Sequence, residues 1–175
     1  MRIVRKSVRP DLRTTSLRGN VDTRVRKALD EQYDAIILAG AGLIRLGLAD
    51  HVRQWIPLDI MLPAAGQGAL AVQCRAEDAE TLELRRALDD AGSRRAVTAE
   101  RAFLAGLGGG CAVPVAAFAM VEGTIRLHGL VASPDGKRVI RVHVDGSDAE
   151  ALGREAARRA IADGAAEVLA MGSLP

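Results

Sequence analysis

The sequence has 175 residues, of which 49% are hydrophobic, 26% are charged and only 2% are aromatic, and its formal net charge is +2. This composition is ordinary for a soluble globular protein, and no apolar run approaches the roughly 18 residues that a membrane helix needs. The two cysteines, Cys74 and Cys111, do not make a disulfide framework, and no Cys/His cluster has metal-site spacing, so we expect no metal and a cytoplasmic location.

Positive charge is concentrated at the start of the chain, where residues 1–27 hold nine Lys or Arg and two Asp. Such an asymmetry favours an anionic partner, although a solvated basic face is an open alternative. We expect no nucleic-acid partner, because the chain has few aromatic side chains on which bases could stack. We also expect no membrane partner.

The pattern of residues 1–61 predicts an α/β domain. Residues 12–17 form a plausible short strand, and an amphipathic helix follows with Asn20 as its N-cap. Residues 36–38 are an apolar run that ends in glycines, which is typical of a strand buried in a parallel sheet. A helical segment over residues 42–56 then stops at Pro57. The order is that of a βαβ unit, but only about two strands are supplied, so the domain is incomplete.

Residues 62–77 predict a turn followed by a strand. Gly66 and Gly68 flank Gln67 in the turn, and the apolar run after them predicts a strand over residues 69–74. Cys74 lies in or beside this strand, and we interpret it as a packing thiol.

Residues 78–175 predict a small α+β domain with a three-stranded antiparallel sheet and helices on one face. The expected helices cover residues 78–89 and 94–107, and the expected strands cover residues 113–121, 124–132 and 138–145. A last helix starts at a capping box made of Ser147 and Glu150 and closes at Gly164.

Two motifs carry candidate chemistry. In RGNVDTR, Arg18 precedes a helix N-terminus and Arg24 lies about one turn inside it, an arrangement that suits a carboxylate or phosphate. Exposed arginines with no ligand are the alternative. In LGGGCAVP, Cys111 follows three glycines that leave space beside its thiol, and the backbone amides of such a turn could lower the thiol pKa. The three histidines lie on a predicted helix and predicted strands, so we interpret them as structural or surface residues.

Three segments in order carry a family resemblance. They are LRGNVDTRVRKALDEQYDAIILAGAGLIRLGL, LPAAGQGALAVQCR and VTAERAFLAGLGGGCAVPVAAFA. They resemble the porphobilinogen deaminases, also called hydroxymethylbilane synthases, and the match runs from about Arg9 onward. The resemblance implies a transferase of tetrapyrrole (heme) biosynthesis that joins four porphobilinogens and releases ammonia at each step. It also implies a monomer, in which residues 1–61 are the incomplete remainder of a second, periplasmic-binding-protein-like α/β domain and residues 62–77 include a hinge.

The resemblance also implies the site residues. Cys111 would hold a dipyrromethane cofactor through a thioether. Arg18, Arg24 and Arg45 would bind the carboxylates of porphobilinogen and of the polypyrrole intermediates, and Gln67 would lie near the cofactor. Ala112 departs from the glutamine that usually follows the cysteine.

The family's catalytic aspartate belongs to an N-terminal domain that this sequence does not contain. The strand over residues 69–74 would normally return to that domain. We therefore expect the chain to be a C-terminal portion of such an enzyme that is inactive alone. The alternative is a non-catalytic anion-binding or interaction module derived from the enzyme.

Overall fold

The computed structural model describes residues 9–108 and 114–171. The chain divides into two compact units, one formed by Asp11–Pro57 and the other containing the described residues from Leu58 onward. Among the helices of the described part, none is both long and apolar enough to cross a membrane.

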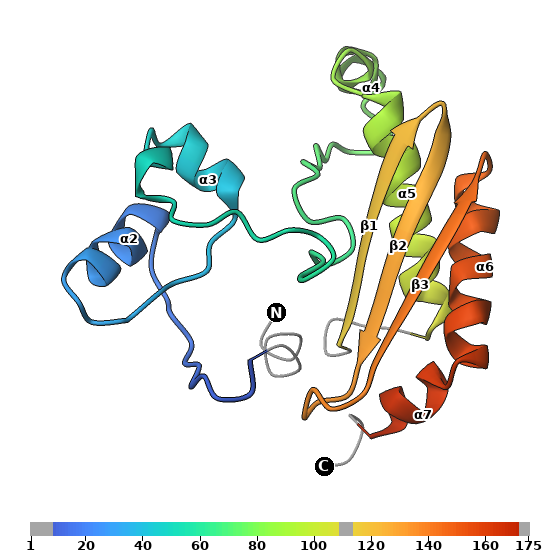
Figure 1. The fold of residues 1–175 in the computed structure, drawn as a ribbon. Coiled ribbons are helices and arrows are strands. Elements are labelled where there is room, and N and C mark those ends of the chain that lie inside the picture. Colours follow the sequence, from blue (N-terminus) through green and yellow to red (C-terminus); the bar gives the residue numbers. More distant parts are fainter. Residues whose placement is uncertain (1–8, 109–113, 172–175) are drawn as a thin grey trace. The chain divides into compact units, whose positions relative to one another are not determined.

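The unit Asp11–Pro57 contains helices and connecting segments (Figure 1). Its elements are α2 (Val21–Leu29), α3 (Gly40–Arg45) and the short 3-10 helix η1 (Ala49–His51). Helix α2 confirms the helix predicted after Asn20, which occupies the N-cap position, and it buries Val25. A Cβ added at Gly42 would lie 3.3 Å from Val21, so the start of α2 packs closely on α3.

Three predictions for this unit are wrong. Residues 12–17 and 36–38 are not strands, and the helix predicted over residues 42–56 is divided into α3 and η1. A strand of a parallel sheet is stable only with neighbouring strands on its edges, and the described part of this unit forms no sheet. The helix is interrupted at Gly47, whose φ of 68° is left-handed and cannot continue an α-helix.

The second unit is a three-stranded antiparallel sheet covered by helices, as predicted (Figure 1). Strands β1 (Val115–Glu122), β2 (Thr124–Ala132) and β3 (Val139–Gly146) lie in that order. The helices are α4 (Ala79–Arg86), α5 (Ala91–Gly106), α6 (Ala149–Ala162) and α7 (Ala165–Ala170). The predicted turns at Gly123 and at residues 133–137 join the strands, and both Gly123 and Gly136 have positive φ values.

The main core lies between one face of the sheet and helices α5, α6 and α7, and α5 and α6 lie on the same side of the sheet in Figure 1. Phe103 of α5 is fully buried there and its ring lies against Gly129 of β2, where an added Cβ would come within 2.6 Å of it. Helices α5 and α6 approach closely because Gly153 has no side chain, and a Cβ there would lie 2.4 Å from the Ala99 carbonyl oxygen.

The opposite face of the sheet is partly covered by the segment that leads into the turn at Gln67. Leu62 is buried against Leu130 and neighbouring apolar side chains of the sheet. The Pro63 carbonyl accepts a hydrogen bond of 3.1 Å from the Ala117 amide, and Arg141 donates one of 3.3 Å to the Ile60 carbonyl. These contacts attach residues 60–63 to the sheet.

Two further predictions are wrong in this unit. Residues 69–74 form no strand, and Leu70 is 85% exposed, because no described strand pairs with this apolar run. The N-cap of α6 is Asp148 and not Ser147, since the Asp148 carboxylate accepts a 2.7 Å hydrogen bond from the Ala151 amide. Asp is at least as good an N-cap as Ser, and Glu150 pairs with Arg154 within the helix.

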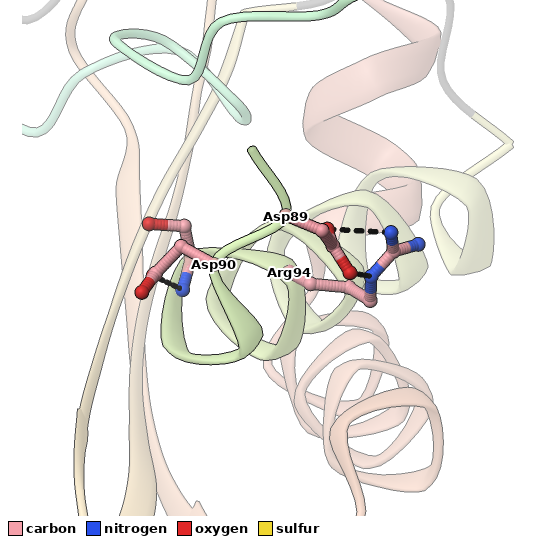
Figure 2. A network of polar contacts seen from close by, with 4 residues as sticks. Asp89, Asp90 and Arg94 are labelled. Atoms are coloured by element: carbon pink, nitrogen blue, oxygen red, sulfur yellow. Dashed lines mark hydrogen bonds and ion pairs between the residues drawn. The ribbon is translucent and has the colours of Figure 1, made fainter. Parts of the chain in front are cut away.

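Helix α5 begins with an ordered polar network (Figure 2). The Asp90 carboxylate accepts a 2.7 Å hydrogen bond from the Ser93 amide, and Asp89 forms an ion pair with Arg94. The Ser93 amide holds the pKa of the Asp90 carboxyl below its ordinary value, and a side-chain hydrogen bond from Ser93 adds to this effect. Asp90 therefore fixes the start of the helix that supplies Phe103 to the core.

Replacing Asp90 by asparagine should make the melting temperature less sensitive to acid. The folded-state pKa of Asp90 is lowered, so its ionic contribution is fully present above the ordinary Asp pKa of about 4 and is lost as pH falls through the folded-state value. An asparagine at this position keeps a capping oxygen that does not titrate in this range. Melting curves between neutral and acidic pH test this, with Asp59→Asn at an exposed position as the control; an equal acid dependence in both variants would contradict it.

Candidate functional site

The guanidinium of Arg24 is held at the N-terminal end of helix α2. Its Nε donates a 2.7 Å hydrogen bond to the Gly19 carbonyl, which lies just before the helix. This bond folds the Arg24 side chain back toward the residue before the helix start, and in the described part of the chain its terminal nitrogens form no ion pair. A cation at a helix N-terminus is opposed by the helix dipole, so the arrangement favours an anion between the guanidinium and the amides.

The other two predicted arginines are exposed. Arg18 lies immediately before Gly19, and Arg45 ends α3 in the same unit. Within residues 9–108 and 114–171, no carboxylate forms an ion pair with Arg18, Arg24 or Arg45. The three guanidiniums can therefore bind an external carboxylate without first breaking an internal ion pair.

Gln67 lies in a tight turn over residues 64–68, which we call the Gln67 turn. Its side-chain Oε1 accepts a 3.1 Å hydrogen bond from the Ala64 amide, and its own amide donates a 3.0 Å bond to the Ala64 carbonyl. Gly66 and Gly68 have φ values of 72° and 91°, a backbone conformation that favours glycine. The side-chain NH₂ of Gln67 is exposed and is left to donate to a ligand.

Glu100, which no sequence motif indicated, binds this turn through its carboxylate. Glu100 lies on α5 with a side chain only 6% exposed. Its Oε2 accepts a 2.6 Å hydrogen bond from the Gly66 amide, and its Oε1 accepts a 2.8 Å bond from the Ala119 amide of β1. Burial raises the pKa of the Glu100 carboxyl above its ordinary value, and the two amide donors and Arg101 oppose that shift. In the sequence, the feature that could have indicated Glu100 was its charge beside the apolar stripe of α5.

Of the two cysteines, Cys74 lies within the described residues and Cys111 does not. Cys111 lies outside the described residues, so the prediction that it carries the cofactor stays a prediction. It belongs to the connection between α5, which ends at Gly106, and β1, which begins at Val115. Cys74 is a partly buried free thiol.

His128 and His143 are cross-strand neighbours on β2 and β3, as the sequence suggested. Their Nδ1 atoms are 2.7 Å apart, and their rings make an edge contact with centroids at 4.5 Å. Burial and then the adjacent His143 lower the pKa of His128. The pair lies on the sheet face opposite the main core, and His51 belongs to η1 in the unit Asp11–Pro57.

Two family models match the chain in succession. Residues 2–83 match the model described as "Porphobilinogen deaminase, dipyromethane cofactor binding domain", and residues 94–162 match "Porphobilinogen deaminase, C-terminal domain". The chain belongs to the porphobilinogen deaminase family.

Curated relatives agree with this assignment. The chain is similar to the porphobilinogen deaminase of Brevibacillus brevis, with 51% identity over 93% of this chain and 53% of the relative. It is 54% identical to that of Geobacillus kaustophilus over 85% of this chain and 49% of the relative. It is 51% identical to that of Pelotomaculum thermopropionicum over 92% of this chain and 53% of the relative. The chain thus spans about half the length of these relatives.

The two porphobilinogen deaminase matches divide the predicted site residues between them. The cofactor-domain match contains Arg18, Arg24, Arg45 and Gln67, and the C-terminal match contains Cys111. The described donors fit a ligand rich in carboxylates, because they are guanidiniums free of internal ion pairs and an amide NH₂. Each unit, taken by itself, thus carries donors that suit the carboxylates of a dipyrromethane with acidic substituents.

Proposed function

We propose that this chain supplies the cofactor-bearing half of a porphobilinogen deaminase, which joins four porphobilinogens into hydroxymethylbilane and releases ammonia at each step. The proposal rests chiefly on the Arg24 guanidinium, which is fixed by Gly19 at the α2 N-terminus within the segment that matches the cofactor-domain model. We also propose that the catalytic aspartate comes from a part of the family fold outside this chain, and that the chain alone is inactive.

Each predicted site residue has a task in this proposal. Arg18, Arg24 and Arg45 bind acetate and propionate groups through charge-assisted hydrogen bonds and so orient the pyrrole rings. The NH₂ of Gln67 donates to the ligand near its attachment point. Cys111 would hold the dipyrromethane through a thioether, and the bound group would supply the free α-carbon for the first porphobilinogen, with each later unit joining the ring added before it. Deamination of porphobilinogen leaves an electron-poor methylene-pyrrole, which a carboxylate would stabilise electrostatically.

A two-part assay tests the proposal. This chain is combined with the half of the Brevibacillus brevis relative that it does not match, and porphobilinogen is added. We expect hydroxymethylbilane, and an adduct on Cys111 with the mass of two porphobilinogens less two ammonia molecules. Cys111→Ser should abolish both, whereas Cys74→Ser, at the other thiol, should retain both. Normal product formation by Cys111→Ser would refute the proposal.

Arg24→Gln should weaken the binding of porphobilinogen to this chain by about tenfold or more, because a charge-assisted hydrogen bond is lost. Isothermal titration calorimetry measures the affinity. Arg26→Gln, at an exposed arginine on the same helix, is the control and should bind nearly as the parent does. Equal weakening in both variants would show that net charge, and not the fixed guanidinium, is responsible.

A non-catalytic anion-binding module is the second candidate, because the same Arg24 geometry would serve it. It predicts that porphobilinogen or other carboxylates bind in an Arg24-dependent way, with no adduct on Cys111 and no product in the two-part assay. The mass spectrum of the Cys111 peptide therefore distinguishes the two functions.

A further inference from the structure

The Glu100 carboxylate joins three parts of the second unit that are far apart in sequence. It lies on α5 and accepts amide hydrogen bonds from Gly66, 34 residues earlier, and from Ala119, 19 residues later. One bond reaches the Gln67 turn and the other reaches β1. Each carboxylate oxygen accepts a hydrogen bond from a different amide, so this one side chain connects α5 to both the Gln67 turn and β1.

The Gln67 turn lies on α5 around this carboxylate. A Cβ added at Gly66 would lie 3.6 Å from Arg101 Nε and 3.8 Å from Val97 Cγ1, and both residues belong to α5. The hydrogen bonds between Ala64 and Gln67 shape the turn internally but do not attach it to the helix. The Glu100–Gly66 bond is the polar contact that anchors it there, on the residue adjacent to Gln67.

The other bond links α5 to β1, which also pack together in the main core. These two elements lie on either side of the connection that contains Cys111 in the sequence. A charged acceptor buried to 6% exposure makes strong, directional bonds to the two amides, because water does not compete for it. The position of the Gln67 turn is thereby tied to the same side chain that ties α5 to β1.

We propose that Glu100 is a positioning residue, whose carboxylate holds the Gln67 turn against α5 and β1 so that the Gln67 amide is presented in one place. The proposal rests on the function proposed above for Gln67. Glutamate is suited to this task because an ionised carboxylate is an acceptor at both oxygens. Glutamine offers one acceptor oxygen and presents an NH₂ to the second amide, so it can keep only one of the two bonds.

Amide hydrogen exchange on the full chain tests the anchor without any substrate. In Glu100→Gln, we expect exchange at Gly66 or Ala119 to quicken by roughly ten- to a hundredfold, because a charge-assisted bond is lost. Glu122→Gln, at an exposed glutamate on β1, is the matched control and should leave both rates within about twofold. Unchanged exchange at both amides in Glu100→Gln would overturn the proposal, as would an equal change in the control.

A double-mutant cycle in the two-part assay separates positioning from general stability. We expect Glu100→Gln and Gln67→Ala each to slow product formation, and the double variant to be hardly slower than Gln67→Ala alone, because both remove the same interaction. Effects that multiply would show that Glu100 acts independently of Gln67 and would overturn the proposal. Glu100→Ala serves only as a second exchange variant, since two amides lose their acceptor and the fold itself is at risk.

Failure of the proposed function has a different signature. If the parent chain forms neither product nor a Cys111 adduct, the function proposed for Gln67 is wrong, and the positioning of a catalytic amide falls with it. The exchange result would then still establish or refute the physical anchor between Glu100 and the Gln67 turn.

Discussion

Replacing Phe103 by alanine is expected to lower the free energy of unfolding of the unit from Leu58 onward by about 3–5 kcal/mol. Phe103 is fully buried on α5 and its ring lies against Gly129 of β2, where glycine leaves room for it. Truncation removes apolar surface from the core and leaves a cavity that neighbouring side chains fill only in part. The expected loss is a large part of the stability of a unit of this size.

Denaturant unfolding followed by far-UV circular dichroism measures this loss. Phe118→Ala is the matched control, because Phe118 is a partly buried phenylalanine on the sheet face opposite the main core. It should cost clearly less than Phe103→Ala. A larger loss in the control would mean that the main core does not lie between the sheet and α5.

Replacing Gly153 by alanine is expected to destabilise the same unit by about 1–3 kcal/mol, against the trend for helices. Alanine is favoured over glycine in a helix interior by about 1 kcal/mol. At Gly153, however, the new Cβ would lie 2.4 Å from the Ala99 carbonyl oxygen and 2.8 Å from the Phe103 amide nitrogen. Backbone atoms cannot rotate away as a side chain can, so α5 and α6 must separate.

Gly92→Ala provides the control with the opposite sign. Gly92 also lies in a helix, but a Cβ there would lie 3.4 Å from the Asp90 carboxylate, which is an ordinary contact. We expect Gly92→Ala to be neutral or stabilising in the same unfolding experiment. A stabilising Gly153→Ala would show that the two helices do not pack as closely as their backbones indicate.

The sheet and its helices could be predicted because their partners are close in sequence. Strands β1, β2 and β3 are joined by short turns at Gly123 and Gly136, so each strand finds its neighbour within a few residues. Alternating burial, as in Val142 and Val144 beside exposed His143, is visible in the sequence itself. Local pattern and observed structure therefore agree in this part of the chain.

Elements that depend on distant partners could not be predicted. The apolar run over residues 36–38 has the composition of a buried strand, but composition does not supply the neighbouring strands that a sheet needs. The anchor made by Glu100 was missed for a similar reason, because its two donors lie 34 and 19 residues away. By contrast, the placement of Arg24 beside a helix start depends only on local sequence, and it was predicted.

The contacts of β1 have a consequence for self-association. β1 is an outer strand of the sheet, and the outward amides of an outer strand can recruit a strand from another molecule. Here the Ala117 amide is occupied by the Pro63 carbonyl and the Ala119 amide by Glu100. These two contacts thus occupy outward amides of the β1 edge. A variant that loses the Glu100 carboxylate would free the Ala119 amide. Strands of other copies of the protein could then pair with this edge, which promotes aggregation.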